Sequence, residues 1–389
     1  MTEHKTRVVV LGGGYAGTIA ANRLRMRPDV DITLVNARPD FVERIRLHQL
    51  LTGSDDAIVD YADVLGEGIR LVVDTATRID GAGRRIALAG GATLEYDYLI
   101  YAVGSTSAES PVPGAREFAY PIAELEEAQR LTGALAELPD SAPVCVVGAG
   151  PTGLETAAEL AEAGRVVTLV CGSVLGPYFR EPARKASAKR LRKLGTQIIE
   201  GDGATVVEVH ADEVVLADGR RIPSRVTIWT AGFGVPDLAK SSGLRTDSVG
   251  RPLTDEPLPS LDAARIIAAG DAASPSGAPL RMSCQAATPL GAQAADTVLA
   301  RIGGTAPAPI NQAFTGECVS LGRHGGVIQI ARPDDTALPL YIGGRAAATV
   351  KEAVCKATVS FMRREARKPG SLFWFKGGRR DVSEPAVAP

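Results

Sequence analysis

The sequence predicts an α/β protein built from two copies of one strand–turn–helix unit, with the second copy inserted into the domain that the first one forms. Three segments support this. The stretch VVVLGGGYAG at 8–17 recurs as VCVVGAGPTG at 144–153, and a third apolar run, ARIIAAGDAA, follows at 264–273. An apolar run, a glycine-rich turn and a helical pattern, in that order, are typical of a parallel sheet with helices on its faces.

The first unit has the features of a dinucleotide site. A β-branched run at 7–11 precedes glycines in G-x-G-x-x-G spacing, and the helical pattern TIAANRL follows. Gly12 permits a tight turn, Gly14 lets the backbone approach a pyrophosphate, and Gly17 lets helix and strand pack closely. The positive end of the helix dipole then stabilises the anion. The next strand, DITLVN, ends at Asn36, about where a ribose-binding residue is expected. The unit is therefore Rossmann-like.

The second unit repeats this pattern. A strand is predicted at 143–148, Gly148, Gly150 and Gly153 follow with the same spacing, and the helix TGLETAAELAEAG comes next. One unit holds one dinucleotide, so two units predict two dinucleotides. Electron transfer between the two is the economical reason to hold both.

The end of the following strand, VVTLV, bears on which dinucleotide binds there. NAD-selective enzymes place a carboxylate at this point, where it bonds the ribose 2′-hydroxyl and repels a 2′-phosphate. This chain has Cys171 and, two residues on, Ser173. Three basic residues follow in the next loop: Arg180, Arg184 and Lys185. The strand end therefore predicts use of both NADH and NADPH, with discrimination below about tenfold.

The third segment distinguishes the two sites. Its Gly270-Asp271 pair resembles the late strand of the two-dinucleotide-binding flavoproteins of the pyridine nucleotide-disulfide oxidoreductase superfamily, where an aspartate bonds the flavin ribityl chain. YDYLIYAVGS, with Gly104, and RVTIWTAGF, with Gly232, resemble the segments that close each nucleotide domain. The resemblance implies that the first unit holds FAD and the second holds NAD(P)H.

The resemblance also implies a division into domains, with the NAD(P) domain inserted in the FAD domain. A small antiparallel meander is expected at 69–96, where glycine pairs supply the turns. The expected parts are an FAD-binding domain at 1–115 and 255–320, an NAD(P)H-binding domain at 116–254, a smaller C-terminal region at 321–380, and a disordered tail at 381–389.

More narrowly, the chain resembles the type II NADH dehydrogenase and apoptosis-inducing-factor-like group over residues 7 to about 330. The segments that carry this likeness are FVERIRLHQLLTG, PTGLETAAEL and MSCQAATPLGAQAAD. It implies that Glu155 lies near the flavin–nicotinamide junction and that Gln285 lies on the quinone-side helix. These two residues are therefore the candidates for catalytic roles. Arg44 is expected to line the flavin pocket, with a solvated helix face as the alternative. Pro289 and Leu290 replace further glutamines expected on the quinone-side helix.

Several classes of site are disfavoured. The segment 41–53 contains no cysteine, which argues against the dithiol relay of the disulfide reductases. The five cysteines are scattered, as is usual in a reducing cytoplasm, and the four histidines show no metal-ligand spacing. The net charge of −2 does not suggest a nucleic-acid partner, and no apolar run reaches the length of a membrane span.

The C-terminal region combines an amphipathic helix with excess positive charge. Across 351–380 there are nine Lys and Arg residues and two Glu residues, a balance of +7. Val350, Val354, Ala357 and Phe361 fall on one helical face, and Lys351 lies off it. Two readings remain open: this face docks on the FAD domain, or the segment 346–380 contacts an anionic membrane surface. The resemblance also allows a homodimer.

Together these features predict a cytoplasmic FAD-dependent NAD(P)H dehydrogenase that passes electrons to a quinone or another small acceptor, with peripheral contact to the inner face of the membrane. Two alternatives remain. One is an NADH-responsive flavoprotein switch of the apoptosis-inducing-factor-like type. The other is a pathway-specific FAD-dependent oxidoreductase acting on a small organic metabolite.

Overall fold

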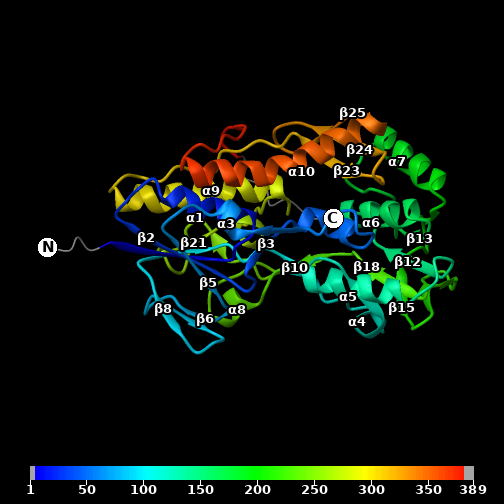
Figure 1. The fold of residues 1–389 in the computed structure, drawn as a ribbon, viewed down its shortest axis with the longest axis horizontal. Coiled ribbons are helices and arrows are strands. Elements are labelled where there is room, and N and C mark those ends of the chain that lie inside the picture. The colour runs from blue at the N-terminus through cyan, green and yellow to red at the C-terminus, as the bar shows by residue number, and fades with distance from the viewer. Residues whose placement is uncertain (1–4, 381–389) are drawn as a thin grey trace.

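The computed structural model describes residues 5–380 and confirms the two-domain α/β fold. Two parallel sheets lie side by side along the long axis of the molecule, and helices α9 and α10 run above them (Figure 1). The predicted tail at 381–389 lies outside the described residues.

The two parallel sheets have the same topology, as expected for two copies of one unit. In each, the strand before the glycine turn is central, and the strand after the first helix is its neighbour. The first sheet has the order β21 (Ile266–Ala268), β9 (Tyr98–Tyr101), β1 (Thr6–Leu11), β2 (Val30–Asn36) and β5 (Ile69–Val73). The second has the order β11 (Ala119–Pro121), β18 (Val226–Trp229), β12 (Pro143–Val147), β13 (Val166–Val170) and β14 (Gln197–Ile199).

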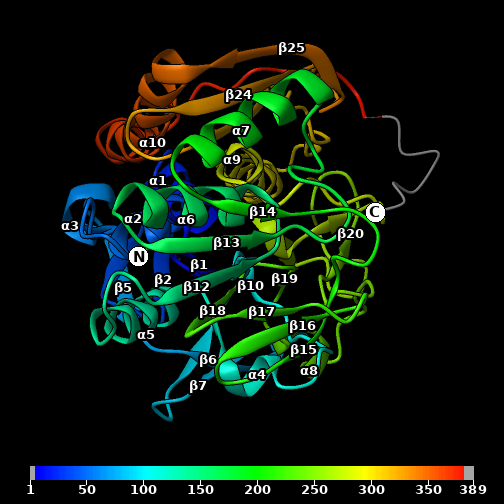
Figure 2. The ribbon, with the colours of Figure 1, turned by 90° about the vertical axis from the view of Figure 1, so that its right-hand side faces the viewer.

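Helices cover the faces of both sheets. Figure 2 looks onto the second sheet, with α6 and α7 above it and a small antiparallel sheet below it. The helices before the C-terminal region are α1 (Tyr15–Leu24), α2 (Leu47–Leu50), α3 (Tyr61–Val64), α4 (Ala115–Phe118), α5 (Leu125–Ala136), α6 (Pro151–Glu162), α7 (Glu181–Lys193), α8 (Leu238–Ser241) and α9 (Cys284–Ile302). The 3₁₀ turns are η1 (Arg44–Arg46) and η2 (Gly270–Ala272).

The remaining short strands pair locally. The antiparallel pairs and sheets are β3 (Asp40–Val42) with β4 (Ile58–Asp60), β10 (Thr106–Ser107) with β19 (Phe233–Gly234), β6 (Ala76–Asp80) with β7 (Arg85–Leu88) and β8 (Thr93–Glu95), and β15 (Val206–Val209) with β16 (Glu213–Leu216) and β17 (Arg221–Pro223). The pair β20 (Leu253–Thr254) and β22 (Ser274–Pro275) is parallel.

Part of the expected meander is wrong. Residues 69–73 form β5, which pairs in parallel with β2 at the edge of the first sheet, from Ile32 opposite Ile69 to Asn36 opposite Val73. The antiparallel meander begins only at β6. The alternating pattern of the segment reflects an edge strand of a parallel sheet, which is covered less completely than the central strands.

The chain crosses between the two domains at β10 and β19. It then returns to the first domain before residue 254, because Leu238, Ala239 and Leu244 pack into the hydrophobic cluster behind the first sheet.

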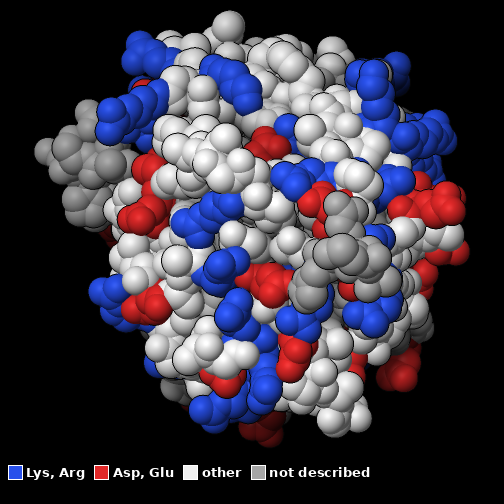
Figure 3. Space-filling view, turned by 90° about the vertical axis from the view of Figure 1, so that its left-hand side faces the viewer, with Lys and Arg blue, Asp and Glu red and all other residues white. Residues whose placement is uncertain are grey.

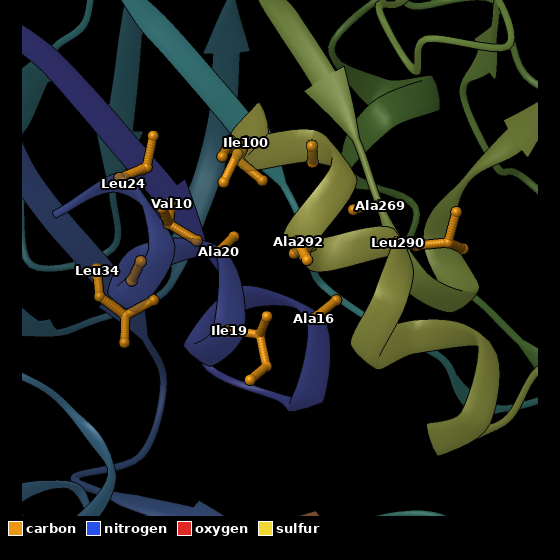
Figure 4. Packing of buried hydrophobic residues seen from close by; sticks show 14 of the residues in the cluster. Val10, Ala16, Ile19, Ala20, Leu24, Leu34, Ile100, Ala269, Leu290 and Ala292 are labelled. Carbon is orange, nitrogen blue, oxygen red and sulfur yellow. The ribbon is translucent and has the colours of Figure 1, made fainter. Parts of the chain in front are cut away.

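Helices α1 and α9 form the closest helix pair of the first domain. Ala16 of α1 and Ala292 of α9 lie where the two helices pass each other, whereas Leu290 points to the far side of α9 (Figure 4). A Cβ on Gly291 would lie 2.1 Å from the carbonyl oxygen of Ala16, so only glycine allows this approach. The contact holds the middle of α9 against the start of α1, and Leu290 is buried in the same hydrophobic cluster.

The C-terminal region is an antiparallel sheet of β23 (Gly316–Ser320), β24 (Gly326–Ala331) and β25 (Ala337–Gly343), followed by α10 (Gly344–Arg367). Helix α10 lies across the top of the molecule in Figure 1 and contacts both α1 and this sheet. Its buried face includes Ala347, Lys351, Cys355, Val359 and Met362.

The expected docking face of α10 is therefore wrong. The face containing Val350 and Phe361 stays open, and these side chains are 44% and 41% exposed. Lys351, expected off the apolar face, is on the buried face and contacts Glu155. Among the residues described, no helix is both long enough and apolar enough to span a bilayer.

Candidate functional site

Both glycine turns have backbone conformations that exclude a side chain. Gly12 has a φ of +98°, and a Cβ there would lie 2.3 Å from the carbonyl oxygen of Ala102. Gly148 has a φ of +113°, and a Cβ there would lie 2.6 Å from Thr230 Oγ1. The chain passes this close to the neighbouring strand end in both units, as the tight-turn role requires.

The helices that follow these turns begin facing open space. Gly14 and Gly150 are the N-cap residues of α1 and α6, neither helix has a side-chain cap, and no atom lies within 4 Å of a Cβ built on either glycine. A Cβ on Gly17 or Gly153 would instead lie within 2 Å of the carbonyl oxygen of the first glycine of its turn. Each turn thus offers free N–H groups at a helix N-terminus, which fits a dinucleotide pyrophosphate. The described residues fit FAD and NAD(P)H at these two places.

Asn36 lies at the end of β2, as expected, but it braces the first turn. Its Oδ1 accepts a hydrogen bond from Gly13 N at 2.9 Å, and its Nδ2 donates to Arg38 O at 2.9 Å. Buried Tyr61 donates from Oη to Gly13 O at 2.7 Å. The sequence analysis missed Tyr61, because only the tertiary fold brings α3 against the turn.

A second group of predicted residues meets where β21 ends. Asp271 Oδ2 accepts a hydrogen bond from Ser105 Oγ at 2.7 Å, and Arg44 Nη1 donates to the same hydroxyl at 3.0 Å. Gly104 and Gly270, with φ values of +72° and +70°, precede Ser105 and Asp271. Within residues 5–380 the second carboxylate oxygen of Asp271 makes no hydrogen bond, so it is free to accept one from a ligand.

A buried charge cluster forms where the two domains and the C-terminal region meet. Glu155 of α6 is 6% exposed, and its Oε1 lies 3.0 Å from Lys351 Nζ of α10. The same oxygen accepts a hydrogen bond from Ser320 N of β23 at 3.0 Å. His48 Nδ1 of α2 lies 3.7 Å from Glu155 Oε2, and His48 Nε2 lies 3.3 Å from Ser320 Oγ. We refer to Glu155, Lys351, Ser320 and His48 as the Glu155 cluster.

The protonation states in this cluster follow from burial and from the neighbouring charges. Burial opposes ionisation of Glu155, but the charge of Lys351 and hydrogen bonding outweigh it and leave the pKa of Glu155 below its usual value. Burial also lowers the pKa of His48 below its usual value, despite the nearby carboxylate. Burial opposes the charge of Lys351, but Glu155 together with the thiols of Cys318, Cys355 and Cys284 outweighs it, so the pKa of Lys351 is raised. At neutral pH an ion pair therefore lies beside a neutral imidazole.

Polar groups continue from the cluster towards the surface. Arg323 donates from Nη2 to Ser320 Oγ at 3.3 Å and from Nε to Glu159 Oε2 at 2.9 Å. Ser54 in turn donates to Glu159 Oε1 at 2.6 Å. Because Ser54 is exposed, this chain joins buried Glu155 to solvent.

Gln285 lies at the start of α9 as expected, but the structure does not bring it into hydrogen-bond contact with the Glu155 cluster. Its Nε2 donates to Thr315 Oγ1 at 2.7 Å. The positive charge of Lys351 acts to lower the pKa of three thiols, those of the preceding residue Cys284 and of Cys318 and Cys355, but burial has the larger effect. Burial raises the pKa of the thiols, to about 11 for Cys284 and about 12 for Cys355, so they are protonated at neutral pH.

In the second domain, Cys171 and Ser173 follow β13 at its carboxyl end, and Gly232, with a φ of +94°, lies just beyond β18. Cys171 is half-buried, and Ser173 is exposed. The basic residues considered for phosphate binding are engaged elsewhere: Arg180 Nε donates to Ala337 O, Arg184 Nη2 donates to Phe179 O, and Lys185 pairs with Glu181.

The chain resembles known proteins over most of its length. Residues 6–291 match the family described as pyridine nucleotide-disulphide oxidoreductase. An NADH dehydrogenase-like protein of Mycobacterium tuberculosis is 31% identical over 324 residues, which cover 76% of this chain and 80% of that relative. A type II NADH:quinone oxidoreductase of the same organism is 28% identical over 372 residues, covering 83% and 79%.

A solved structure also matches. The sulfide:quinone oxidoreductase of Aquifex aeolicus superposes with a TM-score of 0.79 at 20% identity, covering 94% of this chain and 93% of that one. At this identity the likeness shows the shared fold.

Replacing Asp271 should weaken flavin retention. Asp271→Ala removes the acceptor of Ser105 Oγ and the carboxylate oxygen proposed to bond the flavin side chain, a loss of about 1–3 kcal/mol. Asp271→Asn keeps one oxygen acceptor and should lose less. The measurement is the FAD content of purified protein after extensive dialysis. Full flavin retention by Asp271→Ala would contradict the role of this residue.

Removing Lys351 should destabilise the protein in a pH-dependent way. Lys351→Met leaves the Glu155 carboxylate buried without its cation, which typically costs about 3–5 kcal/mol. Glu155 then has a folded-state pKa above its unfolded value, so the deficit is small in acid and grows as the pH rises through the unfolded pKa. Denaturant unfolding at several pH values measures this.

The double variant Lys351→Met/Glu155→Gln is the matched control for that prediction. It removes both charges, so most of the stability lost in Lys351→Met should return, and the difference in stability from the parent protein should no longer depend on pH. A deficit in Lys351→Met that does not change with pH would show that the pair contributes packing only.

Proposed function

The chain belongs to the pyridine nucleotide-disulphide oxidoreductase family, and on that premise we propose that it is an FAD-dependent NAD(P)H dehydrogenase that passes electrons to a quinone or another small acceptor. The observation that carries the proposal is the pair of open glycine turns, one in each parallel sheet. Two dinucleotide sites in one rigid frame suit electron transfer between two cofactors. The relative named as an NADH:quinone oxidoreductase supports the acceptor class.

When bound, FAD supplies the redox chemistry, accepting a hydride from the nicotinamide and releasing electrons to the acceptor. The protein supplies binding and orientation. In this proposal the N-termini of α1 and α6 hold the two pyrophosphates, and Asp271, positioned by Ser105 and Arg44, holds the flavin side chain. The five cysteines are free, and the proposed electron path uses no redox-active disulfide.

The Glu155 cluster is the proposed proton-handling part of the site. Reduction of a quinone to a quinol consumes two protons as well as two electrons, so a dry site needs groups that exchange protons. The His48 ring, neutral at pH 7, lies beside the Glu155 carboxylate and the Ser320 hydroxyl. Gln285, oriented by Thr315, is proposed to contact the acceptor from the start of α9.

Anaerobic reduction tests this function. NADH or NADPH should bleach the flavin absorbance of the holoprotein, and a water-soluble quinone should restore it with multiple turnovers. No flavin reduction by either nicotinamide would overturn the proposal. A long-lived reduced complex that quinones do not reoxidise would favour the conformational switch, and reoxidation by a small metabolite alone would favour the pathway-specific oxidoreductase.

We place the protein in the cytoplasm, with peripheral contact to an anionic membrane surface through residues 346–380. The open face of α10 exposes Val350, Val354 and Phe361, and Phe373 beyond it is 71% exposed. Figure 3 shows acidic and basic side chains interspersed over most of one end of the molecule, with basic ones prominent along its upper rim, on the α10 side. Exposed apolar side chains among basic residues suit the headgroup layer.

The protein should therefore co-sediment with anionic vesicles at low salt and be released as salt rises, because the basic residues are screened. Phe373→Ser/Phe375→Ser should weaken binding several-fold. Val207→Ser/Leu261→Ser, which changes exposed apolar residues elsewhere, should not. Failure of the parent protein to bind at low salt would contradict the membrane contact. The resemblance also allows a homodimer, in which a second copy of the chain could cover this face. Sedimentation velocity without lipid detects such a dimer.

A further inference from the structure

Glu200 lies at the point of the second domain where the dinucleotide ribose is expected. Strands β13 and β14 are parallel neighbours, with Val170 opposite Ile199, and Cys171 N donates to Ile199 O at 2.8 Å. The residue after Ile199 is Glu200, so it follows its strand at the same sheet edge as Cys171 follows β13. In doubly wound folds, ligands bind along this carboxyl edge.

The Glu200 side chain is folded over the loop that follows β13. Its Oε2 accepts a hydrogen bond from Leu175 N at 2.9 Å. The backbone reinforces this closure, since Gly201 N donates to Gly172 O at 3.1 Å and to Ser173 O at 3.0 Å. A carboxylate therefore lies against the loop expected to surround the ribose, although the end of β13 itself carries none.

The charge of this carboxylate reaches the ribose-reading position. Burial raises the pKa of the Cys171 thiol to about 12, and the negative charge of Glu200 adds to that rise. Within residues 5–380 no Lys or Arg forms an ion pair with Glu200, and Arg180, Arg184 and Lys185 contact other groups. Its charge is thus not neutralised by a partner.

We propose that Glu200, supplied by β14, is the residue that selects NADH over NADPH in this chain. This inference rests on the proposed function, because it assigns NAD(P)H to the second domain. A carboxylate accepts a hydrogen bond from the ribose 2′-hydroxyl and repels a 2′-phosphate. The expectation of near-equal use of the two cofactors considered only the end of β13. The neighbouring strand instead makes a preference for NADH the expected result.

A purely structural role for Glu200 is the competing explanation, since its hydrogen bond to Leu175 N closes the loop. Glu200→Gln separates the two roles, because the amide oxygen can still accept that hydrogen bond while the charge is lost. Glu200→Arg goes further by placing a cation where a 2′-phosphate would lie. Glu208→Gln, on β15 of the same domain, removes the same charge from an exposed site and serves as the control.

The experiment measures kcat/KM for NADH and NADPH with one water-soluble quinone, using holoprotein of equal FAD content. The parent should favour NADH by at least about tenfold, a difference of roughly 1.4 kcal/mol. Glu200→Gln should lower the NADH/NADPH ratio by at least about fivefold, and Glu200→Arg should lower it further. Glu208→Gln should leave it unchanged.

Equilibrium binding of NAD⁺ and NADP⁺ to the same holoproteins, measured by calorimetry, supplies a readout that needs no turnover. If neither nicotinamide reduces the flavin, the proposed dehydrogenase function fails while the binding ratio still tests Glu200. A parent that binds or uses both cofactors equally, or a ratio that stays the same in Glu200→Gln and Glu200→Arg, would overturn the role of Glu200.

Discussion

The buried ion pair between Glu155 and Lys351 is the interaction on which the arrangement of the site depends. Glu155 comes from the second glycine unit, Lys351 from the C-terminal helix, and the pair closes over Ser320 of the C-terminal sheet. Burying two charges costs several kcal/mol each, which is recovered only when the geometry is good and the remaining lone pairs are satisfied. Ser320 N satisfies one such lone pair. The pair therefore links three parts of the molecule through one buried contact.

In the proposed function the two glycine turns hold the cofactors, and this ion pair lies between the two units that carry them. The conformation of each turn is determined locally, by a positive φ and a close backbone approach at Gly12 and Gly148. Neither turn determines how the two domains face each other. That arrangement is determined by contacts between the parts of the molecule. Helix α6 packs against β23, and Arg44 donates hydrogen bonds to both Ser105 Oγ and Ala123 O. The Glu155 cluster consequently lies at the junction and not inside either unit.

Much of the fold was predictable from the sequence because its signals are local. The glycine spacing, the strand before it and the helix after it are set by a few neighbouring residues, and both units fold as predicted. Lys351 was misjudged because helical periodicity counts apolar residues, and the buried face of α10 carries a lysine and a threonine among its apolar side chains. Ile69–Val73 was misassigned because alternation does not distinguish a parallel edge strand from a meander. Ser320 contributes a backbone N–H, for which the sequence carries no signal.

Helix α10 has an open face and a buried face, and neighbouring residues of the helix lie on different faces. Val350 and Lys351 are adjacent in sequence, yet one side chain is exposed and the other reaches Glu155. Glu352, the next residue, forms an ion pair with Arg46 of η1, with Glu352 Oε1 3.0 Å from Arg46 Nη2. Consecutive residues of α10 therefore carry an exposed apolar side chain, a member of the Glu155 cluster and a partner of η1.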